Sequence, residues 1–405
     1  MPQLSDYLRT GVVLGVAVAT PLALAACESK SASEGAIGVT STNDECTLET
    51  NEATTGAVKF EVTNNGSKVT EFYVYGKNNR VLGEVENIGP GLKGRVTAEI
   101  TEPGTYEVAC KPGMVGTGIR QELKVTGEVK EKTQAPADVE AAKQNYLSYV
   151  RKQVDGLVAQ TETFVGHVKG GDLDAARAEF GQTRTFYERI EPVAESFQDL
   201  DPAVDMRWDD TEDGAQPFTG FHRLERYLWP PKADEVGDAP GQIAPADAAD
   251  AKKSDTKENI DKAGDELLAN VKRLQTEVNK PDFDFETQLF VQGPQALIDE
   301  IAATKVGGEE DRYSHTDLWD FAANVDGAET LIASLQPVIS QHDQALMDKI
   351  TAQFADVRSA IETLREGDGY ITYDQVPEAK RKELSDKIDA LSATLSKVPG
   401  IVMQK

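Results

Sequence analysis

The sequence predicts two folded parts, a small antiparallel β-sandwich followed by an all-α helical bundle. Short segments that alternate apolar and polar residues fill the chain up to about residue 126, which indicates β-strands. Beyond that point apolar residues recur every three and four positions, which indicates helices with one buried face. A chain of 405 residues with 39% hydrophobic content is long enough for both parts to have their own core.

The first 26 residues are predicted to be a signal peptide and no part of the fold. A polar start containing Arg9 runs into an apolar stretch from Gly11 to Ala26. That stretch is shorter than the ~20 residues a transmembrane helix needs. Its end, Leu24-Ala25-Ala26-Cys27, resembles a bacterial lipobox, and a Ser-, Gly- and Ala-rich tether follows. We therefore predict a lipoprotein anchored to the cell membrane through Cys27, on the extracytoplasmic face (cell surface or periplasm); the alternative is an ordinary cleavage site.

Residues 27–126 are predicted to hold the lipidated cysteine, the tether and the sandwich. Residues 58–62 alternate at period two and lead into Asn64-Asn65-Gly66, a hairpin signal. Further strands are expected at 70–75, 96–100 and 105–109, with a turn at Pro103-Gly104. Short strands at this spacing are typical of a small sandwich.

Residues 127–139 are predicted to be a linker and residues 140–405 the helical domain. The linker is charged, contains Pro136 and lacks apolar periodicity. Leu147, Val150, Val154 and Leu157 then begin the first helical stripe, and similar stripes recur to the end of the chain. The Pro-, Ala- and Asp-rich segment 230–257 has no stripe, so we interpret it as a surface excursion or as a lid near a site.

Clustered acids in the second predicted helix suggest a cation site. Glu188 and Glu191 are three residues apart, and carboxylates at that spacing repel unless a cation lies between them. Pro192 should kink the helix there or mark a boundary between two helices. Among the acids that follow, Asp205 is the one we take as a ligand candidate.

His222 and Glu225 are the most informative pair in the chain. A residue and its neighbour three positions on lie on one helix face, and imidazole with carboxylate suits iron, zinc or manganese. The formal net charge of −27 favours cations and argues against nucleic acid as a partner. The chain contains no His-Glu-x-x-His zinc-peptidase motif, so the residues favour metal binding over hydrolysis.

Three motifs in order resemble the imelysin-like domain of the EfeO/EfeM family. They are Tyr187-Glu188-x-x-Glu191-Pro192-Val193-Ala194-Glu195-Ser196-Phe197, Gly220-Phe221-His222-Arg223-Leu224-Glu225, and the stretch from Gly308 to Trp319. The resemblance covers about residues 140–400, and the preceding part is similar to that family's cupredoxin-like domain. It implies a helical bundle that binds iron, Fe³⁺ or Fe²⁺, and passes it to an EfeU-like permease, with an EfeB-like haem peroxidase as partner.

The resemblance also implies the site residues, which by position are Glu188, Glu191, Asp205, His222, Glu225 and Glu300. Zinc is expected as a substitute for iron. The family carries a peptidase label, which by itself does not establish hydrolysis. We interpret the Glu309–Asp317 stretch as structural, with His315 bracing the fold.

A cupredoxin-like fold raises the question of copper. A blue-copper centre needs two histidines and a cysteine, and residues 28–126 contain no histidine, which excludes such a centre within this domain. The resemblance marks Cys46, Cys110 and Glu71 as a proposed metal site, and two thiolates would suit Cu(I). Outside the cytoplasm the two cysteines can instead form a disulfide, and both readings stay open.

The leading hypothesis is therefore a lipid-anchored, extracytoplasmic iron-binding component of an EfeUOB-type uptake system. The alternative is a metal-dependent enzyme, either a copper ferroxidase or an imelysin-type metallopeptidase.

Overall fold

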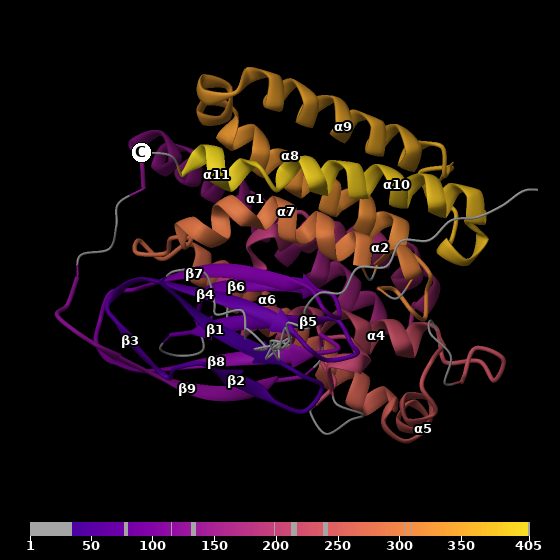
Figure 1. Ribbon diagram of the computed structural model, residues 1–405. Helices are drawn as coiled ribbons and strands as arrows, with labels where there is room; N and C mark the ends of the chain where they lie inside the picture. The colour runs from indigo at the N-terminus through magenta and orange to yellow at the C-terminus, as the bar shows by residue number, and fades with distance from the viewer. Residues whose placement is uncertain are drawn as a thin grey trace, which may run out of the picture.

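The computed structural model describes residues 35–76, 80–114, 116–130, 135–197, 199–211, 217–237, 242–303, 305–308 and 310–403. The predicted signal peptide and the predicted lipidation site Cys27 lie outside these ranges. A β-sandwich and a larger helical bundle make up the described chain, and the sandwich lies along one side of the bundle (Figure 1). Within the described ranges, no helix combines the length and apolar character that crossing a bilayer requires.

Two mixed sheets form the sandwich. One sheet has the order β2-β1-β4-β7, with bounds Cys46–Leu48, Ala36–Ser41, Gly56–Asn64 and Lys93–Ile100. The other has the order β3-β9-β8-β5-β6, with bounds Glu52–Thr54, Ile119–Thr126, Gly104–Pro112, Thr70–Tyr75 and Val81–Ile88. The sandwich is confirmed, but β1 pairs with β4, and β3 with β9, in parallel, because the chain crosses between sheets at these points instead of turning back in hairpins.

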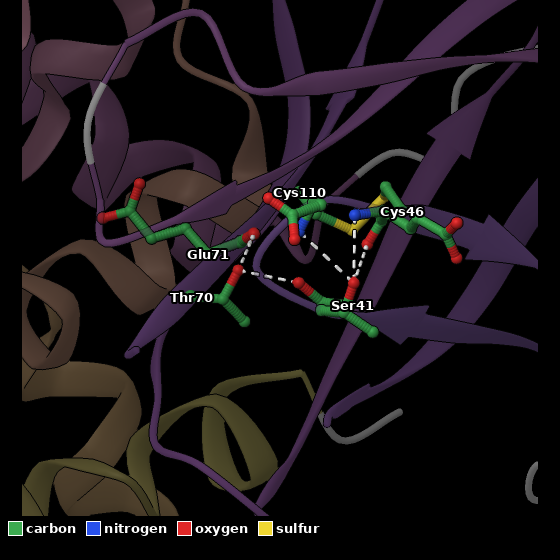
Figure 2. The surroundings of a disulfide bond; sticks show 8 residues. Ser41, Cys46, Thr70, Glu71 and Cys110 are labelled. Atoms are coloured by element: carbon green, nitrogen blue, oxygen red, sulfur yellow. Dashed lines mark hydrogen bonds between the residues drawn. A yellow bond between two sulfur atoms is a disulfide. The ribbon is translucent and has the colours of Figure 1, made fainter. Parts of the chain in front are cut away.

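A disulfide joins the two sheets. Cys46 on β2 is bonded to Cys110 on β8, and both are buried in the core between the sheets (Figure 2). Beside it, the hydroxyl groups of Ser41 and Thr70 hydrogen bond across the same gap at 3.0 Å. A cross-link that closes a loop of this length, 64 residues, stabilises a domain by about 4 kcal/mol in the chain-entropy model.

The second part is helical from residue 137 to residue 402. Its helices are α1 Ala137–Gly170, α2 Leu173–Glu188, α3 Leu200–Asp205, α4 Gly220–Leu228, α5 Pro245–Ser254, α6 Lys257–Val278, α7 Thr287–Ala303, α8 Asp317–His342, α9 Gln344–Glu362, α10 Glu378–Leu395 and α11 Val398–Val402. Short 3₁₀ turns lie at Glu191–Phe197, Trp208–Thr211, Lys305–Gly307 and Tyr373–Gln375, and strands β10 Arg365–Glu366 and β11 Gly369–Tyr370 form a small hairpin. The apolar stripe predicted for the first helix is buried, as expected.

The segment 230–257 packs on the outside of α4. Arg226 of α4 pairs with Asp247 of α5 at 2.6 Å, and Arg223 pairs with Asp255 at 2.6 Å. None of the segment's described residues lines the cavity between the domains that is described below. The described residues of the segment fit a surface excursion, and the lid stays a prediction.

The sandwich contacts the bundle through α7. Leu289 packs into a small apolar cluster with Tyr73, Tyr75, Val81 and Ala109, which come from strands β5, β6 and β8. Beside this cluster Arg80 pairs with Glu286 at 2.7 Å. The five-stranded sheet therefore presents one face to the other sheet and the opposite face to the bundle.

Candidate metal centre

Glu188 and Glu191 lie on either side of the point where α2 ends. The helix stops at Glu188, and the chain resumes as a 3₁₀ turn that begins at Glu191. Pro192 has no N–H to donate, so an α-helix cannot continue through it undisturbed. The backbone of α8 packs against this break at Gly327, where a Cβ atom would lie 2.3 Å from the carbonyl oxygen of Arg189. Of the two expectations for Pro192, a kink or a boundary, the structure shows a boundary.

Asp205 and His222 meet where α3 ends and α4 begins. Gly220, the first residue of α4, has a φ of +79°, and a Cβ there would lie 2.3 Å from the carbonyl oxygen of Val204. Only glycine combines this backbone angle with so close an approach. The contact places Asp205 Oδ1 3.6 Å from His222 Nε2.

The segment between α7 and α8 adds two more acids. Glu310 Oε1 lies 3.7 Å from His222 Nε2, and Asp311 Oδ1 lies 3.8 Å from His222 Nδ1. The chain turns inward at these two residues before α8 begins, so the interpretation of this stretch as structural does not account for their place beside His222. It fits His315, whose carbonyl oxygen accepts a hydrogen bond from the N–H of Tyr373 at 2.8 Å.

Arg184 is the central cation of the cluster. It is fully buried on α2, one turn before Glu188. Its guanidinium reaches five carboxylates: Glu188 at 2.6 Å, Asp320 at 3.1 Å, Glu310 and Asp311 at 3.4 Å each, and Asp205. A planar guanidinium that donates in several directions can hold such a set at fixed positions.

Lys305 is the second buried cation. Its ammonium lies 2.8 Å from Glu191, 3.5 Å from Glu188 and 3.8 Å from Glu310, and it donates to Asn324 at 3.1 Å. Asn324 in turn donates to Glu188 Oε2 at 2.9 Å and to Glu191. Lys305 and Asn324 therefore hold the acids on the two sides of the α2 break together.

Carboxylates outnumber these cations. Among the described residues, Arg184, Lys305, His222 and the half-buried Arg207, which pairs with Glu310 at 3.3 Å, face seven acids: Glu188, Glu191, Asp205, Glu225, Glu310, Asp311 and Asp320. Burial raises the pKa of Asp205 to about 6 and those of Asp311 and Asp320 well above their usual range. Burial also opposes ionisation of Glu310, but Lys305, Arg207 and His222 outweigh it and lower the pKa of Glu310. A further cation would favour the ionised form of the acids whose pKa is raised.

His222 is held between carboxylates. Burial and the charge of Arg184 lower the pKa of His222, but the carboxylates of Glu225, Glu310 and Asp205 outweigh them and raise it to about 10. Its Nδ1 is 2.9 Å from Glu225 Oε2, whereas its buried Nε2 has no hydrogen-bond partner in the part of the chain that the structure describes. A cation that bound at Nε2 would replace the proton there.

Within the described ranges, three groups of ligand atoms lie close enough to hold an ion. In each, one atom per residue lies within 4.8 Å of the others, and the groups are Asp205–His222–Glu310, Glu188–Glu191–Asp205 and His222–Glu225–Asp311. Imidazole nitrogen with carboxylate oxygens suits iron, zinc or manganese.

A cavity of about 440 Å³ leads to this cluster from the domain interface. The bundle contributes Glu191, Asp205, Glu300 and Glu310 to its wall, and the sandwich contributes Glu71 among others. Acids from both domains therefore face the same space.

Comparison with known proteins places this architecture in a family. The imelysin family model matches residues 142–398, and the cupredoxin-like domain model matches residues 14–120. The iron uptake system component EfeO of Escherichia coli O157:H7 is 34% identical over 402 residues, covering 98% of each chain. The chain belongs to the EfeO family. Two further relatives align over most of the chain. They are the EfeO components of Shigella flexneri (34% identity, 98% of each chain) and of Escherichia coli O6:K15:H31 (35% identity, 90% of this chain and 91% of the relative).

Among solved structures, reduced auracyanin from Roseiflexus castenholzii matches 24% of this chain and 100% of its own, at 15% identity and a TM-score of 0.19.

In this EfeO-family protein, five of the six predicted imelysin-domain residues come together in the cluster: Glu188, Glu191, Asp205, His222 and Glu225. The sixth, Glu300 on α7, lies in the cavity wall, where burial raises its pKa. Sequence reasoning missed Glu310 and Asp311 as members, although both lie within a motif that carried the resemblance. It also missed Arg184, for which the i, i+4 spacing to Glu188 was an available signal.

The cupredoxin-like domain does not bring its three predicted residues into one site. Phe72 is the partner of Cys110 across the β5–β8 ladder, so Cys110 shares a face with Phe72 and not with Glu71. Figure 2 shows the Glu71 side chain directed away from the disulfide, and its carboxylate accepts a hydrogen bond from Tyr73 at 3.1 Å. The cysteines are bonded to each other, so they offer no thiolates, and these residues do not fit a copper centre.

Proposed function

We propose that this protein is the extracytoplasmic iron-binding component of an EfeUOB-type uptake system. In this proposal the cluster around His222 captures iron, and the bound ion is then passed to a membrane permease. The single observation that carries the proposal is the buried Nε2 of His222, which has no hydrogen-bond partner among the described residues and faces Asp205 and Glu310.

Two further observations support iron as the cargo. Relatives that align over nearly the whole chain are named as iron uptake components. The excess of carboxylates over buried cations attracts a di- or trivalent ion, and the acidic cavity wall offers a route to it. Glu300 is assigned to that route, and Glu188, Glu191, Asp205 and Glu310 to the capture site.

Iron titration of the protein without its leader tests the proposal. Fe(II) under anaerobic conditions and Fe(III) in a weak chelate are each added to the wild type, with Zn²⁺ as a redox-inert substitute. We expect His222→Ala to weaken binding by at least about tenfold, the scale of a metal-site change. The control is His342→Ala, an exposed histidine at the end of α8. Equal affinity in all three proteins would refute the site.

The membrane anchor and the partners belong to the same proposal. A lipidated Cys27 would keep the protein in the membrane fraction, and Cys27→Ala would release it, which fractionation and mass spectrometry of the N-terminus can measure. Transfer to an EfeU-like permease predicts that ⁵⁵Fe uptake by cells needs both proteins. An EfeB-like haem peroxidase is the third component, and loss of its gene should lower uptake without changing iron binding by this protein.

The enzyme alternatives have less support. A copper ferroxidase needs a copper centre, and the disulfide and the separated Glu71 do not supply one. Elemental analysis with a free-thiol count tests this directly, with the expectation of no bound copper and no free thiol at residues 46 and 110. A metallopeptidase is tested by metal-dependent peptide turnover, which we expect to be absent.

A further inference from the structure

The two residues of the His-x-x-Glu motif have different surroundings in the structure. His222 presents to the acidic cluster a nitrogen that no described residue hydrogen bonds, whereas Glu225 is fully buried and already hydrogen bonded. Glu225 Oε1 accepts from the backbone N–H groups of Tyr313 at 2.9 Å and Ser314 at 2.8 Å. Its Oε2 pairs with His222 Nδ1 at 2.9 Å.

These contacts use most of the lone pairs with which the Glu225 carboxylate can accept hydrogen bonds. A carboxylate oxygen has two lone pairs, and two backbone donors fill both lone pairs of Oε1. The remaining oxygen faces Nδ1. An ion that bound Oε1 would have to displace a backbone N–H group and leave that buried donor without a partner. The second lone pair of Oε2 lies beside Nδ1, so an ion held there would be on the Nδ1 side of the imidazole ring.

The geometry of the imidazole ring separates Glu225 from the cluster. Nδ1 and Nε2 lie on opposite sides of the ring, and Nε2 is the atom that faces Asp205 Oδ1 at 3.6 Å and Glu310 Oε1 at 3.7 Å. One ion cannot bind Nε2 and Glu225 together. A histidine that binds a metal generally donates its other N–H to a carboxylate, which fixes the tautomer and the ring orientation.

We infer that Glu225 is a positioning residue and not a ligand, and that Glu310 supplies the carboxylate facing His222 across the ion. Glu225 is anchored by the Tyr313–Ser314 backbone and holds the Nδ1 proton, so that Nε2 is presented to the cation. This inference rests on the proposed function, since it assigns roles within that site. The segment that carries Glu310 also anchors Glu225 through the backbone of Tyr313 and Ser314. This short segment therefore positions both the Glu310 carboxylate and, through Glu225, the His222 ring.

Nitrogen-15 NMR of histidine-labelled protein loaded with Zn²⁺ tests the inference on the wild type. We expect the His222 signal to show zinc on Nε2 and a proton on Nδ1. Zinc on Nδ1 would overturn it, because Nδ1 is the nitrogen that faces Glu225 and Asp311. This measurement does not depend on any variant folding, and His222→Ala identifies the signal.

Glu225→Gln tests the same point by affinity. The amide oxygen can still accept from the two backbone N–H groups, which turns the amide NH₂ towards Nδ1 and forces the proton onto Nε2. We expect Zn²⁺ to bind about 10- to 100-fold more weakly, while Nε2 remains the ligand at saturating Zn²⁺. Glu266→Gln, an exposed change on α6, is the control and should bind like the wild type. Unchanged affinity in Glu225→Gln would overturn the positioning role.

The two hypotheses fail in different ways. If the wild type binds Zn²⁺ and iron and His222→Ala abolishes binding, but the NMR signal shows zinc on Nδ1, the inference is wrong and the proposed function stands. If His222→Ala binds like the wild type, the proposed site is wrong, and the role of Glu225 falls with it.

Discussion

Replacing Lys305 by methionine tests how the acidic cluster is held together without a bound ion. Methionine keeps much of the volume of the side chain and removes the ammonium that lies 2.8 Å from Glu191 and 3.5 Å from Glu188. Lys305 is fully buried, so water cannot replace it without a change in packing. Removing one partner of a buried ion pair costs about 3–5 kcal/mol, because the remaining charge stays buried and unpaired.

Urea unfolding followed by tryptophan fluorescence measures this loss of stability in the helical domain, which contains Lys305. All three tryptophans, Trp208, Trp229 and Trp319, lie in the helical part, so the signal does not report the sandwich. With a urea m-value of up to about 3 kcal/mol/M, a loss of 3 kcal/mol moves the midpoint by at least about 1 M. Lys262→Met, a change at an exposed lysine paired with Glu258 at 3.3 Å, should cost less than about 1 kcal/mol.

Adding an ion should reverse part of the effect. An ion present at 100 times its dissociation constant stabilises the folded state by about 2.7 kcal/mol. Lys305→Met should gain more from Zn²⁺ than the wild type gains, since its cluster has lost a positive charge. A metal-free variant within about 1 kcal/mol of the wild type would refute the reasoning, because the cluster would then lose its charge by proton uptake and not through Lys305.

Three further predictions concern pH, backbone packing and the disulfide. The pKa of Asp205 is about 6 in the folded protein and lower in the unfolded protein, so this group makes the metal-free protein less stable as pH rises from about 4 to 6. Zn²⁺ affinity should rise over the same range. Urea titrations measure the stability and calorimetry measures the affinity, each at several pH values. Gly220→Ala should destabilise the bundle by at least about 1 kcal/mol and weaken Zn²⁺ binding, whereas Gly166→Ala, at an open position of α1, should stabilise the bundle by up to about 1 kcal/mol. The same assays measure both variants, and a Gly220→Ala protein more stable than Gly166→Ala would contradict the packing argument. Replacing Cys46 and Cys110 together by serine should destabilise the sandwich by about 4 kcal/mol and leave Zn²⁺ affinity unchanged. Unfolding followed by the circular dichroism signal of β-structure measures the loss of stability. Weaker Zn²⁺ binding would show that the cysteines serve the metal site.

Local spacing explains what the sequence predicted well. The period-two segments and the three-and-four stripes depend on neighbouring residues, and both domains follow from them. The same holds for Glu188 with Glu191 and for His222 with Glu225, since their spacing alone brings each pair together. Asp205 was one of several acids in its loop, and its place beside His222 became visible only through the contact between α3 and α4.

What the sequence did not predict depends on long-range contacts. Lys305 reaches its carboxylates from the 3₁₀ turn that follows α7, and no local pattern marks a buried lysine as their counter-ion. The resemblance marked Glu71 and Cys110 as members of one site, but their separation depends on which residue of β5 faces Cys110 across the ladder. Strand register of this kind is set by pairing between strands and not by either strand alone.

The cavity shared by the two domains links their docking to the ion. Glu71 on the sandwich and Glu300 on α7 both face it, and burial raises the pKa of each above its usual range. Repulsion from the charge of Glu300 adds to the shift of Glu71. A cation in this space lowers that repulsion, so it favours the docked arrangement of the domains. By thermodynamic reciprocity, docking must then favour the cation by the same factor. Separating the sandwich from the bundle would therefore act as a release mechanism. A partner that separates the two domains would lower the affinity for the ion without contacting any ligand residue.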